Sequence, residues 1–234
     1  MKIAFVPSTF LPWLGGAEVQ THNTANKLIE IGNEVDILIL KKEDISNKKY
    51  NILELNKFII NIFFLFKYYF NIDLTFFLKV YFKKICLNKK YEVWNFQSVN
   101  FKTLLYIKPL KDLNQKVVIT FHGADIQKDM NIKYGYRFDQ KYENLLKKTL
   151  KIIDKVYAIS DTIINELVLL NYPKDKIVKI PNSVELKKFQ ECKILKKNKE
   201  TIKFITVARY YEKKKGLDLI EQVSKYLIEK KINF

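Results

Sequence analysis

Residues 116–125 read KVVITFHGAD, and this stretch decides the fold. Val117 to Phe121 form a continuous apolar run rich in β-branched side chains, which is typical of a central parallel strand covered on both faces. His122, Gly123 and Asp125 follow directly. Ligands of open α/β sheets bind just beyond the carboxyl ends of the strands, so His122 is placed to donate a hydrogen bond or carry charge into that crevice. The alternative is a loop histidine that caps the next segment.

The charge of the chain is strongly positive, at +17 over 234 residues, and comes almost wholly from lysine. Arg137 and Arg209 are the two arginines. Proteins that read nucleic acids depend on arginine for bidentate contacts to phosphate and guanine, so the composition argues against a nucleic-acid partner. An anionic surface or a polyphosphate substrate fits the charge, and a coding bias toward lysine is the alternative.

The cysteines and histidines indicate neither a disulfide framework nor a metal site. Cys86 and Cys192 have no CxxC spacing, and His22 and His122 lie far apart in the sequence. The longest uncharged apolar run, residues 58–66, is too short for a membrane span, which needs about 20 residues. We therefore expect a reduced, cytoplasmic protein that binds no metal and does not cross a bilayer.

The first 40 residues predict a β-loop-α-β unit with parallel strands. Strands are expected at 2–7 and 35–40, with a helix over 17–31 between them. Gly15 and Gly16 precede the helix, where free backbone N–H groups can bind an anion, although a loop that only needs flexible residues is the alternative. Because the chain has no GxGxxG and no GxxxxGK[ST] motif, we expect neither a dinucleotide cofactor nor a P-loop.

The rest of the chain extends this pattern into a parallel sheet. Residues 41–57 are expected to form a polar connection, and 58–87 two amphipathic helices broken at 71–73, with Leu74, Phe77, Leu78, Tyr81 and Ile85 on one face of the second. These helices either pack on the sheet or bind a membrane. Further strands are expected at 91–97, 155–159, 177–180 and 202–207, and further helices at 101–110, 134–149, 162–170 and 217–230.

We thus predict an α/β protein with helices on both faces of a Rossmann-like parallel sheet. Residues 1–189 form the complete domain, 190–200 a linker, and 201–234 the first β-α unit of an incomplete second Rossmann-like domain. A lone strand and helix cannot bury their own apolar faces, so the sequence resembles a truncated protein.

Four segments, in this order and spacing, resemble the glycosyltransferases of family 4. They are the Gly15–Gly16 loop, FHGAD at 121–125, IPNSVELKKF at 180–189 and FITVARYYEKKKGLDLI at 204–220. The resemblance implies the GT-B fold, in which two Rossmann-like domains face each other. It also implies a retaining sugar transfer without a bound metal or cofactor, with the acceptor on the first domain and the nucleotide-sugar donor on the second.

The same resemblance implies roles for individual residues. His122 would hydrogen-bond a hydroxyl of the donor sugar, and Asp125 in the same segment would help to bind substrate. Gly15 and Gly16 would line the diphosphate and acceptor side. Arg209 and Lys215 would hold the departing diphosphate, where cations stabilise the developing charge, although Lys213 and Lys214 are alternatives to Lys215.

The sequence departs from the family at three places. Ser183 replaces the usual glycine after Pro181 and Asn182, and the loop 209–216 is one residue longer than is common. The family's paired glutamates, seven residues apart in the second domain, have no counterpart.

We therefore expect a glycosyltransferase of surface polysaccharide or glycoconjugate synthesis that acts on a glycan or lipid-linked acceptor. It would lie on the cytosolic face of an anionic membrane. A non-catalytic remnant or acceptor-binding partner subunit of a split enzyme is the first alternative. A basic nucleic-acid-binding protein is the second.

Overall fold

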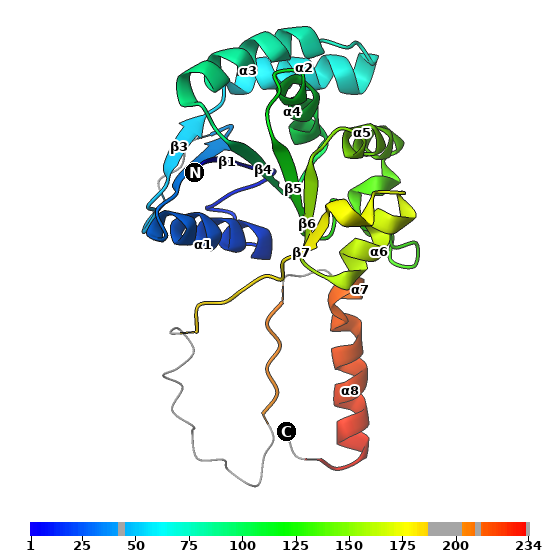
Figure 1. Cartoon of the computed structure of the whole chain (residues 1–234). Coiled ribbons are helices and arrows are strands. Elements are labelled where there is room, and N and C mark those ends of the chain that lie inside the picture. Colours follow the sequence, from blue (N-terminus) through cyan, green and yellow to red (C-terminus); the bar gives the residue numbers. More distant parts are fainter. Residues whose placement is uncertain (42–44, 187–202, 209–211, 233–234) are drawn as a thin grey trace. The chain divides into compact units, whose positions relative to one another are not determined.

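The computed structural model describes residues 1–41, 45–186, 203–208 and 212–232. By its internal contacts the chain divides into one unit of Met1–Lys128 with Gly135–Ser183, and another of Asp129–Tyr134 with Val184–Phe234. The first unit contains a seven-stranded parallel sheet (Figure 1). Its strands are β1 (Lys2–Pro7), β2 (Glu34–Ile39), β3 (Asn51–Glu54), β4 (Val93–Gln97), β5 (Val117–Phe121), β6 (Lys155–Ala158) and β7 (Ile177–Lys179).

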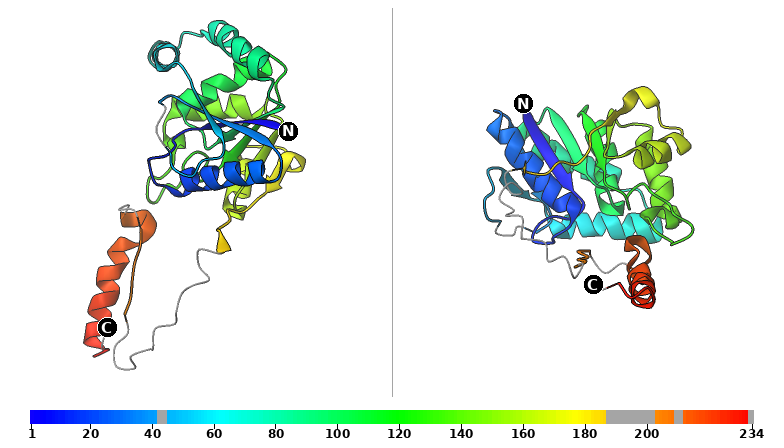
Figure 2. Two further views of the ribbon diagram at one scale, coloured as in Figure 1. Left: turned by 90° about the vertical axis from the view of Figure 1, so that its left-hand side faces the viewer. Right: turned by 90° about the horizontal axis from the view of Figure 1, so that it is seen from below.

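The strands lie in the order β3-β2-β1-β4-β5-β6-β7, so the direction of winding reverses between β1 and β4. This is the Rossmann order, and the reversal creates the crevice in which such folds bind ligands. The helices of the first unit lie on either side of the sheet (Figures 1 and 2). They are α1 (Gly16–Glu30), α2 (Lys57–Phe70), α3 (Thr75–Lys89), α4 (Phe101–Lys111), α5 (Gln140–Leu150) and α6 (Asp161–Leu169). The predicted α/β fold is confirmed.

Two hydrophobic cores cover the two faces of the sheet, because successive side chains of a strand point to opposite faces. On β1, Ile3 and Phe5 join the smaller core with Ala25 of α1, whereas Ala4 and Val6 join the larger core. The larger core contains buried side chains of α3, α4, α5 and α6. β5 contributes five buried residues, as its continuous apolar sequence predicts.

Strand β3 was missed by the sequence analysis, which assigned residues 41–57 to a polar connection. Asn51–Glu54 pairs with β2 in parallel, from Asp36↔Asn51 to Ile39↔Glu54. This strand is at the edge of the sheet, and its four residues are exposed or half-buried. A short edge strand with one neighbour needs no continuous apolar run, so its sequence gives little signal.

The two aromatic helices are present as predicted, with a break at 71–73, where the Thr75 N–H donates to Asp73 Oδ1 at 2.9 Å. The expected apolar face of α3 is partly wrong. Leu78 and Phe82 are buried, whereas Phe77 is 58% exposed, because α3 turns Leu78 and Phe82 rather than Phe77 toward α4 and the core. Within the described ranges, no helix is long and apolar enough to cross a membrane.

The second unit contains α7 (Glu212–Lys215) and α8 (Leu217–Glu229). The predicted helix over 217–230 is thus confirmed, whereas α7 lies in a stretch expected to be a loop. The expected strand at 202–207 is wrong for its described part, since residues 203–208 have no regular secondary structure. A strand needs a neighbour for its backbone hydrogen bonds, and residues 203–208 pair with no described strand. The expected linker at 190–200 lies outside the described residues.

Candidate functional site

The carboxyl ends of β1, β4 and β5 meet beside the point where the winding of the sheet reverses. Ser8 follows β1, Gln97 ends β4 and His122 follows β5. The backbone holds these ends together, since the Ser8 N–H donates to the Gln97 carbonyl at 3.3 Å and the Ser98 N–H to the Thr120 carbonyl at 2.9 Å. His122 therefore lies where ligands of open α/β sheets bind.

A chain of hydrogen bonds fixes the protonation of His122. Thr120 Oγ1 donates to Asn95 Oδ1 at 3.0 Å and accepts from Gln97 Nε2 at 3.3 Å. The amide of Gln97 therefore turns its oxygen toward His122, with Oε1 3.2 Å from Nε2. A carbonyl oxygen accepts, so Nε2 carries the proton and Nδ1 has a free lone pair.

Nδ1 of His122 is buried and has no hydrogen-bond partner among the described residues. Burial lowers the pKa of the imidazole, and the charges of Asp125 and Glu18 only partly oppose this effect. The ring is therefore neutral near pH 7. Its unpaired nitrogen is an acceptor on a neutral ring, so His122 brings no positive charge to the crevice.

Asp125 is only 1% exposed, which conflicts with the direct substrate contact expected from the sequence. Its Oδ1 accepts from the N–H groups of His122 at 3.1 Å and Gly123 at 2.8 Å. Gly123 has φ = 139°, a conformation that favours glycine, so FHGAD forms a tight turn closed by its own carboxylate. Burial also raises the pKa of Asp125. Asp125 is a positioning residue that holds the backbone of His122.

Gly15 and Gly16 begin α1, as predicted. Gly15 is the N-cap in an extended conformation with no side-chain cap, and a Cβ at Gly16 would meet no heavy atom within 4 Å. The space beside Gly16 is therefore open. Glu18 lies in the same turn, and its carboxylate accepts a hydrogen bond from Thr9 Oγ1.

Glu18, Thr9 and Gln97 were missed by the sequence analysis. Glu18 lies near enough to His122 for its charge to influence the imidazole pKa. The signal for Gln97 was its position at the end of the strand that pairs with β5, where it lies opposite Thr120. That signal can be read only when the strand order is known.

The expected donor-side residues are Arg209 and Lys215. Arg209 lies outside the described residues. Lys215 ends α7 in the second unit and is exposed. Within the described part of the chain, no group of three or more His, Cys, Asp and Glu side chains is placed to hold a metal ion.

Several solved structures share the fold. A glycosyltransferase from Rickettsia africae matches with a TM-score of 0.52 and 19% identity, over 81% of this chain and 45% of that one. Anabaena HepE, solved with UDP-glucose, matches with 0.55 and 12%, over 80% and 45%. Sucrose-phosphate synthase from Thermosynechococcus elongatus matches with 0.54 and 14%, over 80% and 49%. The chain thus spans less than half the length of these structures.

No curated protein sequence matches the chain. The family model described as Glycosyltransferase Family 4 matches residues 14–188, which is most of the sequence and includes the glycine loop, the FHGAD turn and strands β2 to β7. The strand order, the turn at His122 and this match agree, and the chain belongs to glycosyltransferase family 4.

Proposed function

We propose that this chain provides the acceptor-side domain for transfer of a sugar from a nucleotide-sugar donor to a glycan or lipid-linked acceptor, with retention at the sugar carbon. The observation that carries the proposal is a neutral His122 with an unpaired nitrogen at the carboxyl end of β5, next to the crevice of a family 4 fold. Anabaena HepE, a neighbour in fold, was solved with UDP and with UDP-glucose, which supports a nucleotide-sugar donor.

In this proposal a small rotation of the His122 ring brings Nδ1 to a hydroxyl of the donor sugar. The open space above Gly16 admits the diphosphate or the acceptor. Departure of a nucleoside diphosphate builds up negative charge, and we assign Arg209 and Lys215 to stabilise it. Lys213 and Lys214 remain alternatives to Lys215.

Release of nucleoside diphosphate tests the proposal. Residues 1–189 are fused to the donor-side half of a family 4 enzyme, and UDP-sugars and lipid-linked acceptors are supplied to the fusion and to the 234-residue chain. We expect turnover by the fusion. Turnover only when a separate donor-side half is added to the chain supports a partner subunit of a split enzyme. No turnover in any combination contradicts the proposal.

We further propose that the acceptor is lipid-carried and that α2 and α3 rest on the cytosolic face of an anionic membrane. These helices expose large apolar side chains in a group that we call the α2–α3 face. Its members are Phe58, Leu65, Phe66, Tyr69, Phe70, Phe76, Phe77, Val80 and Leu87. Lys79 and Lys83 lie on the same helices, and the net charge is +17. Exposed aromatic residues edged by lysine are typical of helices that lie in the headgroup region.

Co-sedimentation with vesicles tests this second proposal. Each lysine near anionic lipid contributes about 1 kcal/mol, so we expect binding to phosphatidylserine vesicles, loss at high salt and no binding to neutral vesicles. Lys79→Glu with Lys83→Glu should weaken the binding. Lys148→Glu with Lys151→Glu, on and after α5, is the matched control and should have little effect. Absence of binding to both vesicle types contradicts the proposal.

A further inference from the structure

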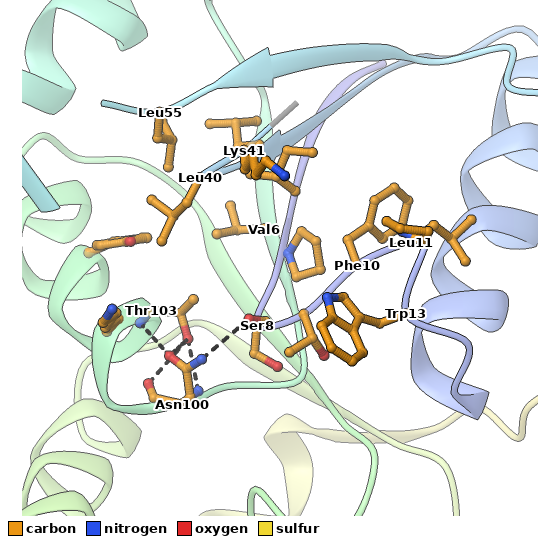
Figure 3. Close-up of a pocket in the computed structure, with 17 residues that line it drawn as sticks. Val6, Ser8, Phe10, Leu11, Trp13, Leu40, Lys41, Leu55, Asn100 and Thr103 are labelled. Carbon is orange, nitrogen blue, oxygen red and sulfur yellow. Dashed lines mark hydrogen bonds between the residues drawn. The ribbon is translucent and has the colours of Figure 1, made fainter. Parts of the chain in front are cut away.

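A cavity of about 220 Å³ lies at the carboxyl ends of β1 and β2, against the first half of α4 (Figure 3). Apolar side chains form most of its wall, among them Val6, Phe10, Leu38, Leu40 and Leu55. A cavity of about 150 Å³ in a protein core can hold benzene, so this one has room for a larger apolar group. The residues after β1 join it to the candidate site, because Thr9 lines the cavity and donates to Glu18.

Tyr106, on α4, lines this cavity and is 2% exposed. Its hydroxyl is buried and has no hydrogen-bond partner among the described residues. Burial raises its pKa, so the hydroxyl stays protonated and can donate or accept a hydrogen bond. An unpaired buried hydroxyl destabilises the fold, and such a group in a cavity wall is a candidate ligand contact.

Three other polar side chains around the cavity, those of Asn100, Lys102 and Thr103, already have partners. Asn100 Oδ1 accepts from the Thr103 N–H at 3.0 Å, and its Nδ2 donates to the Ser8 carbonyl at 3.3 Å (Figure 3). Lys102 Nζ donates to Asn61 Oδ1 of α2 at 2.8 Å. A sugar or nucleotide body would bring many hydroxyls without partners. The wall instead fits a hydrocarbon body with one oxygen beside Tyr106.

The cavity adjoins the start of the α2–α3 face. Leu55 lines both the cavity and a shallow hollow at the beginning of α2. Phe58, which is 73% exposed, lines that hollow, and Trp13, which is 77% exposed, lines the cavity. Lys102, from the cavity wall, lies 4.9 Å above the ring of Phe64 on α2. The cavity and the hollow thus adjoin at Leu55, which places the start of the α2–α3 face beside the cavity.

We propose that this cavity holds the part of a lipid-carried acceptor nearest its reactive end, an aliphatic or prenyl chain whose first oxygen hydrogen-bonds the Tyr106 hydroxyl. The inference rests on the proposed function, since the chain comes from a lipid-linked acceptor. It assigns a ligand class to Tyr106 and to the pocket beside Thr9.

Calorimetric titration of the 234-residue chain with 1-octanol, without vesicles or donor, tests the site. We expect saturable binding by the unmodified chain. Tyr106→Phe removes only the hydroxyl, and we expect octanol binding about fivefold weaker with an unchanged or higher melting temperature, because the lost group had no partner. Tyr172→Phe is the matched control, since its hydroxyl is also buried without a described partner but lies outside the cavity wall. That variant should bind octanol normally.

Leu40→Trp fills the cavity from a half-buried position and should abolish binding. Leu11→Trp replaces it if that variant does not fold. The inference is wrong if the chain does not bind octanol, if Tyr106→Phe binds as tightly as the unmodified chain, or if neither filling variant weakens binding. Absence of octanol binding together with sugar transfer by the fusion would overturn the inference alone. Octanol binding without transfer would instead count against the proposed function.

Discussion

Val117–Phe121 and Phe204–Val207 are made of the same residue types, VVITF and FITV, yet they have different structures. The first is β5, paired with β4 and β6, and all five of its residues are buried. The second has no regular secondary structure, and Ile205 and Val207 are 88% and 89% exposed. Figure 1 shows both, the first in green and the second in orange. Composition alone therefore does not make a strand; neighbouring strands do.

Helices differ from strands in this respect. α8 exposes the side chains of Leu219, Ile220 and Val223 and buries none of its residues, yet it is a helix of 13 residues. α4, by contrast, buries Leu104, Ile107 and Leu110 in the larger core. A helix satisfies its backbone hydrogen bonds within itself, whereas a strand depends on its neighbours. This is why the helix after residue 216 was predicted correctly and the strand before it was not.

The largest expected effect comes from a substitution in the buried segment of this comparison, β5. Ile119→Asp buries an unpaired carboxylate in β5, where Ile119 is 0% exposed, and costs several kcal/mol. Because domains of this kind are stable by only about 5–15 kcal/mol, we expect loss of cooperative unfolding in urea. Ile205→Asp, at a position 88% exposed, should leave the transition unchanged. Fluorescence of buried Trp94 reports the transition.

Ile119→Val is the conservative control, with an expected cost of about 0.5–1.5 kcal/mol. If Ile205→Asp destabilised the first unit as much as Ile119→Asp, the two segments would share one folding unit. The contrast between the two segments would then be wrong.

The next effect concerns His122, the residue directly after β5. In the fusion protein, His122→Ala should lower turnover about a hundredfold, because losing one hydrogen bond aimed at the transition state costs about 3 kcal/mol. The melting temperature should fall only slightly, since the substitution removes one described side-chain hydrogen bond, between Nε2 and Gln97 Oε1. Gln97→Leu should lower turnover less and change its pH profile, because it removes the oxygen that orients the ring, together with the amide N–H that donates to Thr120. Surviving activity with a lower melting temperature would make His122 a structural cap.

Much of the fold was predictable because it depends on local patterns. The continuous run at β5 and the glycine start of α1 identified a parallel sheet with a ligand-binding edge. Strand β3 could not be identified, because an edge strand of four half-exposed residues differs little from a polar loop. Phe77 was misassigned because α3 carries aromatic side chains on more than one side, so helical spacing alone does not show which face is buried.

The candidate site was predictable at His122 and less so around it. Asp125 was chosen because it lies beside the histidine in sequence, but its carboxylate turns back onto the N–H groups of its own turn. Gln97 acts on His122 across two strands, and this contact depends on the β4–β5 register. A contact across strands has no fixed spacing in the sequence, whereas a turn has one.

A smaller effect separates two aspartates that each follow a strand. Asp125→Ala leaves backbone N–H groups of the FHGAD turn unpaired and should lower the free energy of unfolding by about 1–3 kcal/mol. Asp161→Ala, after β6, removes an exposed ion pair with Lys179 and should cost less than about 1 kcal/mol. Urea denaturation measures both. Equal costs would show that Asp125 does not hold the turn.

The smallest effect is the pH dependence that His122 confers on stability. Burial lowers its folded-state pKa below the ordinary value of 6.5, so below that pH the unfolded chain binds more protons than the folded one. The stability that the neutral His122 contributes is therefore fully present above pH 6.5. It is lost as the pH falls from there toward the folded-state pKa, and the free energy of unfolding then decreases by at most about 1.4 kcal/mol per pH unit. The buried Asp125, whose pKa is raised, acts in the opposite direction.

Replacing each histidine in turn shows which of them causes this pH dependence, because the chain contains only 2 histidines. His122→Gln should flatten the decrease in stability between pH 7 and 6, measured by urea denaturation. His22→Gln is the control, since His22 lies on α1 beside Tyr50 and far along the chain from the FHGAD turn. If stability is flat from pH 7 to 6 in the unmodified chain, or if His22→Gln removes the slope, then His122 is not held neutral by burial. The assignment of Nδ1 as a free acceptor would then fail with it.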